Sequence, residues 1–297
     1  MPGDNALKLP SYGGQALMEG VMMRGKNHAA MAVRAPDGEI VTYQEALPDL
    51  YRSKWTTIPF VRGIFNLWDA MGLGMRFLTR SANIASGEDQ KIEGKELTFA
   101  VLVSILIAVA LFFLLPAFLA GLIEKHFSLS AWWSNLIEGG LRLLILIGYM
   151  AYIGRIPEIG RVFAYHGAEH KTINAFEAGV ELTPEEVSKQ SLVHPRCGTS
   201  FMLTLVLISV IIFTLVGPLP LHWRLISRVL MIPLVSGIAY EYIRFAANMM
   251  DRSALVRFLI RPNLWLQKLT TREPDLTMLE VSIEAFNTMI EAEGTGI

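Results

Sequence analysis

The sequence predicts a mainly α-helical, polytopic membrane protein with about four transmembrane helices, a small N-terminal β-containing region and an interfacial helix. Three observations predict this class: four long apolar runs, a short alternating segment near the N-terminus, and an apolar helical pattern interrupted by charge. Hydrophobic residues make up 52% of the 297 residues and charged residues 18%, which is apolar for a soluble enzyme. The net charge of −1 gives no reason to expect a nucleic-acid partner.

Residues 1–57 are expected to form a cytoplasmic region that contains β structure. A Pro-Asp-Gly turn signal lies within Ala30–Val41, and apolar residues alternate around it, which predicts two strands. The preceding segment, Gly13–Gly25, is rich in glycine, which indicates a backbone that turns or closely approaches another group. Within it, Glu19 and Arg24 are interpreted either as inward-facing polar groups or as a surface ion pair.

Residues 58–96 are expected to form an interfacial helix followed by a linker. The segment Ile58–Asn83 is apolar, but charged residues interrupt it and make it a poor transmembrane segment. Such a helix lies in the membrane interface, or packs on the membrane core, with its basic residues toward the headgroups. A polar, charged stretch after this helix is the expected linker.

Residues 97–247 are expected to form a four-span membrane domain. The predicted spans are Leu97–Ile123, Leu136–Ile153, Thr199–Val216 and Leu225–Ala247. The first has no charged residue and exceeds the roughly 20 residues that a bilayer crossing needs. The second contains Glu138 and Arg142, one helical turn apart on one face, and these two are expected to pair near the far interface.

Basic residues in the loops predict the orientation. The loops on one side carry Lys125 and Arg224, whereas the N-terminal region, the segment 154–198 and the tail each carry several Lys or Arg. The positive-inside rule therefore places both termini in the cytoplasm, together with the segment between the second and third spans. A lone cysteine, Cys197, agrees with a reducing compartment.

The C-terminal tail, residues 248–297, is expected to be cytoplasmic, soluble and helical. Pro274 precedes a capped helix start at Asp275 or Thr277. An amphipathic stripe follows at Leu279, Ile283, Phe286 and Ile290. This spacing is typical of a helix with one buried face.

Potential metal ligands gather between the second and third spans, in residues 155–199. His166 and His170 lie four residues apart, so a helix over Pro157–Ala178 would put both imidazoles on one face, where they can hold one divalent ion. Glu169, between them, would take a proton from the attacking water, and this His-x-x-Glu-His order is an inverted zinc-peptidase signature.

A second cluster, His194 and Cys197, must return to the same membrane face to begin the third span. Helix ligands joined by ligands from a distant loop commonly complete such sites. If His166, His170, His194 and Cys197 all bind, the site is full and structural. If only three bind, water takes the fourth place and Glu169 can act as a base. Zinc is the expected ion, and histidines bonded to backbone or phosphate are the alternative without a metal.

Further polar residues are assigned supporting roles. Asn174 and Glu177 share the stripe of the two histidines, but the helix rises about 10 Å over seven residues, so Glu177 is not expected to bind the metal. Lys171 is expected to point into solvent. Glu241, in the fourth span, either orients a ligand histidine or pairs with Arg244.

Four segments carry a family resemblance. They are GGQALMEGVMMRG (Gly13–Gly25), YHGAEHK (Tyr165–Lys171), HPRCGTSF (His194–Phe201) and GIAYE (Gly237–Glu241). Together they resemble the bacterial YqhQ family of polytopic membrane proteins over nearly the whole chain. The resemblance implies a multi-pass protein of the bacterial inner membrane, of unknown function and often described as a predicted metal-dependent enzyme. It also draws attention to Gln15, Glu19 and Arg24.

Two functions are compatible with these residues. The first is a metal-dependent hydrolase acting at the cytoplasmic membrane interface. The alternative is a non-enzymatic membrane factor with a structural metal site, for example a scaffold in membrane-protein biogenesis, in which the glycine-rich segment and the Ile58–Asn83 helix would contact other membrane proteins. Both make the lipid bilayer a partner. Metal transport is less well supported, because the spans contain few polar residues.

Overall fold

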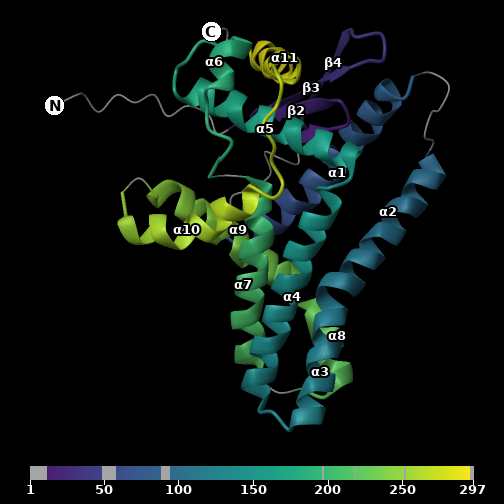
Figure 1. Ribbon diagram of the computed structural model, residues 1–297, viewed down its shortest axis with the longest axis vertical. Coiled ribbons are helices and arrows are strands. Elements are labelled where there is room, and N and C mark those ends of the chain that lie inside the picture. Colours follow the sequence, from purple (N-terminus) through teal and green to yellow (C-terminus); the bar gives the residue numbers. More distant parts are fainter. Residues whose placement is uncertain are drawn as a thin grey trace.

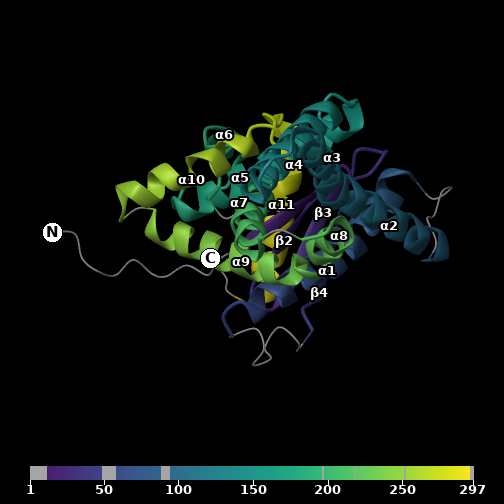
Figure 2. The same ribbon diagram turned by 90° about the horizontal axis from the view of Figure 1, so that it is seen from below.

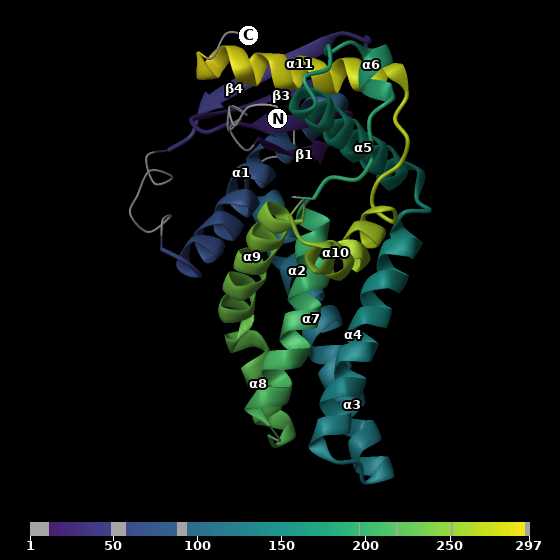
Figure 3. The ribbon, with the colours of Figure 1, turned by 90° about the vertical axis from the view of Figure 1, so that its left-hand side faces the viewer.

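The computed structural model describes residues 12–48, 58–87, 94–195, 197–217, 219–250 and 252–294. A four-stranded antiparallel sheet, covered by helices, lies at one end of the molecule, and a bundle of long helices extends away from it (Figures 1 and 3). This arrangement confirms the predicted class, a mainly helical membrane protein with an N-terminal β-containing region.

The helices of the described chain are α1 (Val61–Ala85), α2 (Gly94–Val109), the π-helical η3 (Ala110–Leu114), α3 (Leu115–Phe127), α4 (Ala131–Ile153), α5 (Pro157–Glu177), α6 (Pro184–Ser188), α7 (Gly198–Val216), α8 (Leu221–Leu230), α9 (Ile232–Met249), α10 (Ala254–Gln267) and α11 (Leu276–Glu293). The strands are β1 (Gly13–Leu17), β2 (Gly20–Arg24), β3 (His28–Arg34) and β4 (Ile40–Ala46). The sheet order β1-β2-β3-β4 is a simple meander.

Three antiparallel pairings of consecutive strands build the sheet, and two of their hairpins bear on the predictions. The predicted one is β3–β4, and its turn contains Gly38 at φ 90°, a conformation that favours glycine. The glycine-rich segment forms the other hairpin, β1–β2, which the sequence did not predict as strands because glycine weakens the strand signal. Its turn contains Glu19 at φ 51°.

Both faces of the sheet are buried at β2 and β3, whose successive side chains point to opposite faces. Val21 and Met23 pack with residues of α5 and α11 on one face. Met22 packs on the other face with Leu73 and Phe77 of α1. The sheet is therefore a layer between α1 on one side and α5 with α11 on the other.

The four predicted membrane spans are matched by four helical segments. Three helices are long and apolar enough to cross a membrane: Phe99–Phe127, Trp132–Ile153 and Gly198–Val216. The fourth candidate is the pair α8 and α9, which is bent by 49° and counts as one span if both halves cross together. Pro233 follows the bend, and its ring removes the N–H that a continuous helix would need there.

α11 forms as predicted. Asp275 is its N-cap, and the Asp275 carboxylate accepts the N–H of Met278 at 2.8 Å. The predicted stripe, which is buried against the sheet and α5, consists of Leu279, Ile283, Phe286 and Ile290.

α10 lies within residues 248–297, the region expected to form a soluble, helical tail. It lies crosswise to α7 and α9 in Figure 3, and Figure 2 shows it on the side of α7 and α4 opposite α2. Large apolar side chains of α10, among them Phe258 and Trp265, are exposed.

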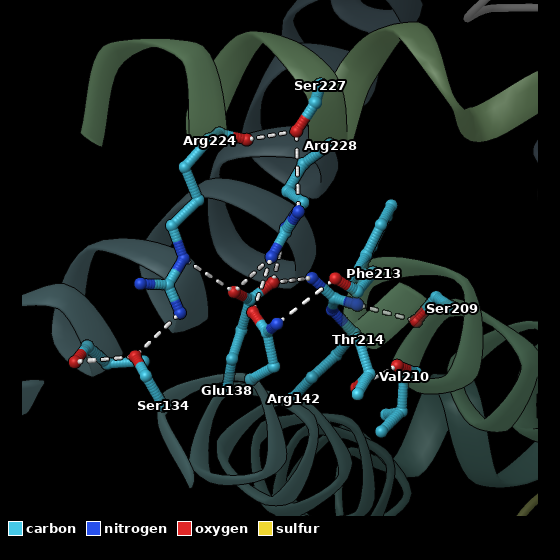
Figure 4. A network of polar contacts seen from close by, with 12 residues as sticks. Ser134, Glu138, Arg142, Ser209, Val210, Phe213, Thr214, Arg224, Ser227 and Arg228 are labelled. Atoms are coloured by element: carbon cyan, nitrogen blue, oxygen red, sulfur yellow. Dashed lines mark hydrogen bonds and ion pairs between the residues drawn. The ribbon is translucent and has the colours of Figure 1, made fainter. Parts of the chain in front are cut away.

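A buried ionic cluster joins α4 to α8 at the end of the bundle away from the sheet (Figure 4). Glu138 accepts hydrogen bonds from Arg142 at 2.8 Å, from Arg224 at 3.1 Å and from Arg228 at 2.7 and 2.8 Å. The predicted Glu138–Arg142 pair is confirmed. Arg224, which was counted as a loop residue, is only 6% exposed, because α8 packs back over α4 and brings this guanidinium to Glu138.

Candidate metal site

α5 carries the histidine pair and lies between the sheet and the bundle (Figures 1 and 3). Pro157 occupies its first position, where the missing N–H costs no hydrogen bond, and Gly179 at φ 68° follows its end. The helix predicted over Pro157–Ala178 is therefore confirmed. It places the rings of His166 and His170 on one face with their centroids 4.4 Å apart.

His166, His170 and Cys197 bring their potential ligand atoms within 4.8 Å of one another. Cys197 Sγ lies 3.2 Å from His166 Nε2. Two ligands that bind one zinc ion tetrahedrally, at about 2.0–2.3 Å each, lie about 3.3–3.7 Å apart. The group therefore needs only small adjustments to hold one ion.

Main-chain carbonyls orient both imidazoles. His166 Nδ1 lies 2.9 Å from the carbonyl oxygen of Thr270, and His170 Nδ1 lies 2.6 Å from that of Leu192. A carbonyl oxygen only accepts, so each Nδ1 carries a proton, and in the neutral imidazole Nε2 then keeps its lone pair. His170 Nε2 is buried and has no hydrogen-bond partner within the described ranges. A buried nitrogen without a partner needs an explanation, and a bound metal ion would supply one. In metal-binding histidines the other ring nitrogen commonly donates to a carbonyl or carboxylate, as Nδ1 of His170 does here.

Cys197 is the N-cap residue of α7 and is buried. The Thr199 hydroxyl lies 3.1 Å from its Sγ and is able to donate a hydrogen bond to it. The N-terminus of a helix also favours negative charge. Cysteine binds metals as the thiolate.

Glu169 lies beside this group. Its Oε2 is 3.8 Å from His166 Nε2, and the side chain is buried. A Cβ atom at Gly14 would collide with Glu169 Cγ and with the carbonyl oxygen of Met22, so the glycine allows β1 to lie directly against Glu169. The glycine-rich segment thus forms a wall next to the candidate base. Its glycines had indicated a close backbone approach, but the sequence did not identify the group approached.

His194 is adjacent to the group but is not one of its three members. Its ring centroid lies 5.7 Å from that of His170, and its Nε2 lies 3.7 Å from a carboxylate oxygen of Glu177. Within the described chain, this Nε2 is also buried without a hydrogen-bond partner. Gln267 fixes the main chain of His194, because its amide accepts the His194 N–H at 3.0 Å and donates to the His194 carbonyl at 2.8 Å.

Asn174 supports the loop that carries His194. Its Nδ2 donates to the carbonyls of Ser191 and Val193 at 2.8 and 3.2 Å. Together with Gln267 and Thr270, it forms a polar frame around the histidines. Gln267 and Thr270 were missed from the sequence, because neither residue has a spacing that marks it as part of a site.

Glu19 connects the glycine-rich hairpin to α5. Its carboxylate accepts from Nε and Nη2 of Arg161, both at 2.5 Å, and lies 3.4 Å from the Tyr165 hydroxyl. The hydrogen bond to Glu19 raises the pKa of Arg161 above its usual range. Burial, followed by the charge of Glu19, raises the pKa of Tyr165 as well. The other marked residue of this segment, Arg24, ends β2 opposite Gly13.

The side chain of Lys171 does not point into solvent as predicted. It is only 3% exposed, and its Nζ binds the carbonyl of Ser188 and the carboxylate of Glu273, each at 2.5 Å. The physical reason is that the chain around α6 and the segment before α11 both cover this face of α5. The lysine therefore fastens these two segments to the helix.

Glu241 lies at a contact between helices, not at the histidines. Its carboxylate is hydrogen-bonded to the Arg62 guanidinium at 2.5 and 2.6 Å and to the N–H of Phe60. A Cβ atom at Gly237 would collide with the carbonyl of Phe60, so this glycine lets the start of α1 approach α9. The sequence suggested a ligand histidine or Arg244 as the partner of Glu241. Its hydrogen-bonded partner is instead Arg62.

Gly167 is a close-approach position within the site helix. A Cβ atom there would collide with the carbonyl of Arg272 and with the Leu192 side chain. We predict that Gly167→Ala lowers the free energy of unfolding by about 1–3 kcal/mol, because the segment containing Thr270 must move away from His166. Thermal unfolding and metal content would report the two effects.

The matched control for Gly167→Ala is Gly72→Ala. Gly72 is exposed on α1 and has open space at its Cβ position, so alanine there is expected to leave stability unchanged or to raise it slightly. Equal unfolding temperatures for the two variants would show that Gly167 is not in close contact with the carbonyl of Arg272.

Comparisons with known proteins agree on a family. The family model DUF1385, described as a protein of unknown function, matches residues 58–292. The chain is 39% identical over 301 residues to "Uncharacterized protein YqhQ" of Bacillus subtilis (strain 168), covering 96% of this chain and 93% of that protein. No solved structure matches the chain.

Proposed function

Since the chain belongs to the DUF1385 family, whose function is unknown, we propose from its site that it is a zinc-dependent membrane hydrolase. One observation carries this proposal: His170 Nε2 is buried and without a hydrogen-bond partner in the described chain, beside His166 and Cys197. Burying a polar atom without a partner is unfavourable, and a metal ion would satisfy it.

The donor set favours zinc. Two imidazole nitrogens and one thiolate are ligands that zinc accepts readily in tetrahedral sites. Catalytic zinc sites have three protein ligands, and structural sites have four. A zinc ion held by His166, His170 and Cys197 would supply Lewis acidity, which activates a water molecule and polarises a substrate carbonyl or phosphoryl group.

The protein residues would carry out the proton transfers. Glu169 accepts a proton from the attacking water at Oε2 and returns it to the leaving group, so one water is consumed and one bond is broken. The carbonyls of Thr270 and Leu192 hold the two imidazoles in place during the reaction. The wall formed by β1 at Gly14 limits the space open to the Glu169 side chain.

The position of the site indicates a substrate at the membrane surface. Cys197 directly precedes α7, which is a candidate span, so the three ligands lie where the bundle meets the sheet layer. The distribution of loop arginines and lysines supports a cytoplasmic location for this face and for both termini. The proposed substrates are therefore membrane proteins or lipids reached from the cytoplasm.

A second candidate function rests on His194. Its Nε2 is buried without a partner in the described residues, and its ring lies next to that of His170. A small shift of the loop would make it a fourth ligand and close the site. The protein would then be a non-enzymatic membrane factor with a structural metal, such as a scaffold for other membrane proteins. Ile64 and Trp68 of α1, together with Phe60 directly before it, are exposed and apolar and would offer a contact surface, whereas β2 is buried.

The test compares Glu169→Gln with Glu158→Gln, an exposed glutamate in the first turn of the same helix. We expect one zinc ion per chain in the wild type and in both variants. Hydrolysis of a panel of peptide, ester and phosphodiester reporters in nanodiscs should fall by about 10²–10⁴-fold in Glu169→Gln only. Full activity of Glu169→Gln would exclude Glu169 as the base. Absence of hydrolysis by the zinc-loaded wild type would exclude the hydrolase and favour the structural site. A wild type without stoichiometric metal would overturn both candidates.

A further inference from the structure

α10 and the residues next to it form a strongly basic segment. Residues 252–272 contain five Arg or Lys and no Asp or Glu. All five are exposed: Arg252, Arg257, Arg261, Lys268 and Arg272, of which Arg272 donates to the carbonyl of Gly154. A basic segment without compensating acids on a helix is typical of contact with an anionic surface.

The helix presents three faces. One packs into the protein: Ile260, Asn263 and Gln267 are buried, and Asn263 donates to the Thr204 hydroxyl of α7 at 2.8 Å. The second face is apolar and exposed. Its residues follow helical spacing, at i, i+3, i+4 and i+10: Leu255, Phe258, Leu259 and Trp265. The third holds Arg257, Arg261 and Lys268, which share one stripe at spacings of four and seven residues.

The position of α10 makes lipid the natural occupant of its apolar face. α10 packs against α7 and α9, which belong to candidate spans, and lies crosswise to them where they approach the sheet layer (Figures 2 and 3). A helix that leaves a bilayer-spanning bundle sideways at this level runs in the plane of the membrane. Trp265 is 75% exposed there, and tryptophan favours the interface between acyl chains and headgroups.

We infer that α10 is an in-plane helix that binds anionic phospholipids in the leaflet next to the sheet layer. Leu255, Phe258 and Trp265 enter the acyl boundary, while Arg257 and Arg261 contact the phosphates. A zwitterionic surface would satisfy the apolar face alone, whereas the unbalanced positive charge selects for negatively charged lipid. The inference does not depend on a metal in the histidine site.

The test uses the fluorescence of Trp265 in nanodiscs that contain brominated phospholipid. Subtracting the Trp265→Phe variant isolates its contribution from the other tryptophans. At equal mole fraction, brominated phosphatidylglycerol should quench Trp265 more strongly than brominated phosphatidylcholine. The preference should fall by about fivefold for each arginine removed in Arg257→Gln and Arg257→Gln/Arg261→Gln.

Lys189→Gln is the matched control. Lys189 is an exposed base at the end of α6 in the sheet layer, so its removal should leave the lipid preference unchanged. Unchanged thermal unfolding of the arginine variants will show that the fold is intact. Equal quenching by the two lipids in the wild type would overturn the proposal. Absence of Trp265 quenching by either lipid would also overturn it and would indicate that α10 faces a protein partner.

Discussion

Replacing Glu138 with glutamine is expected to lower the free energy of unfolding by about 3–5 kcal/mol, because it leaves buried arginines without their shared counter-charge. Glu138 is only 1% exposed, and it receives hydrogen bonds from Arg142, Arg224 and Arg228. Glu124 contacts Arg224 alone and is partly exposed, so it cannot replace this charge. Thermal unfolding in nanodiscs should show a midpoint about 10 °C lower.

Glu158→Gln is the control for this variant, since Glu158 is exposed in the first turn of α5. It should unfold within about 1–2 °C of the wild type. The double variant Glu138→Gln/Arg228→Gln should recover part of the loss, because it removes one uncompensated charge together with its partner. A Glu138→Gln variant as stable as the wild type would show that hydrogen bonding, and not charge, holds the cluster.

The second large effect is expected for His170→Ala, which should lower zinc affinity by more than about 100-fold. Loss of a supporting residue typically lowers metal affinity by about 10–100-fold, and His170 contributes a ligand atom itself. Competition with a zinc-binding dye in detergent would measure the change. His126→Ala, which removes an exposed histidine from the last turn of α3, should leave affinity unchanged.

His194→Ala decides between the two candidate functions. If three residues bind the ion, His194→Ala keeps most of the zinc affinity, because His194 only adjoins the group. If four residues bind it, His194→Ala loses affinity as severely as His170→Ala. Equal zinc affinity for His170→Ala and the wild type would contradict both arrangements.

The parts of the fold that were predictable from the sequence are those with a repeating local pattern. Long apolar runs identified the spans, and a stripe of four residues identified α11, because helices of this length carry their signal within a few turns. The β1–β2 hairpin had no such pattern. The Glu138–Arg228 and Glu241–Arg62 pairs join residues 90 and 179 positions apart, and no local pattern encodes contacts between such distant helices.

The candidate site shows the same division. His166 and His170 were identified by their spacing on one helix, and Cys197 was added because the chain must return to the same membrane face. Their geometric grouping is seen in the structure, while their role as ligands stays a prediction. The residues that orient the histidines were not identifiable, because Thr270 and Leu192 act through main-chain carbonyls, which every residue type possesses.

The contact between His166 and Thr270 sets an order of events during synthesis. The carbonyl that orients His166 lies 104 residues later in the chain, beyond α7, α9 and α10. When α5 has left the ribosome but the later elements have not, the chain lacks both Cys197 and the Thr270 carbonyl that orients His166. Metal capture is thus expected to follow insertion of the last span and the return of the chain after α10, so a loaded site would report that assembly of the protein in the membrane is complete.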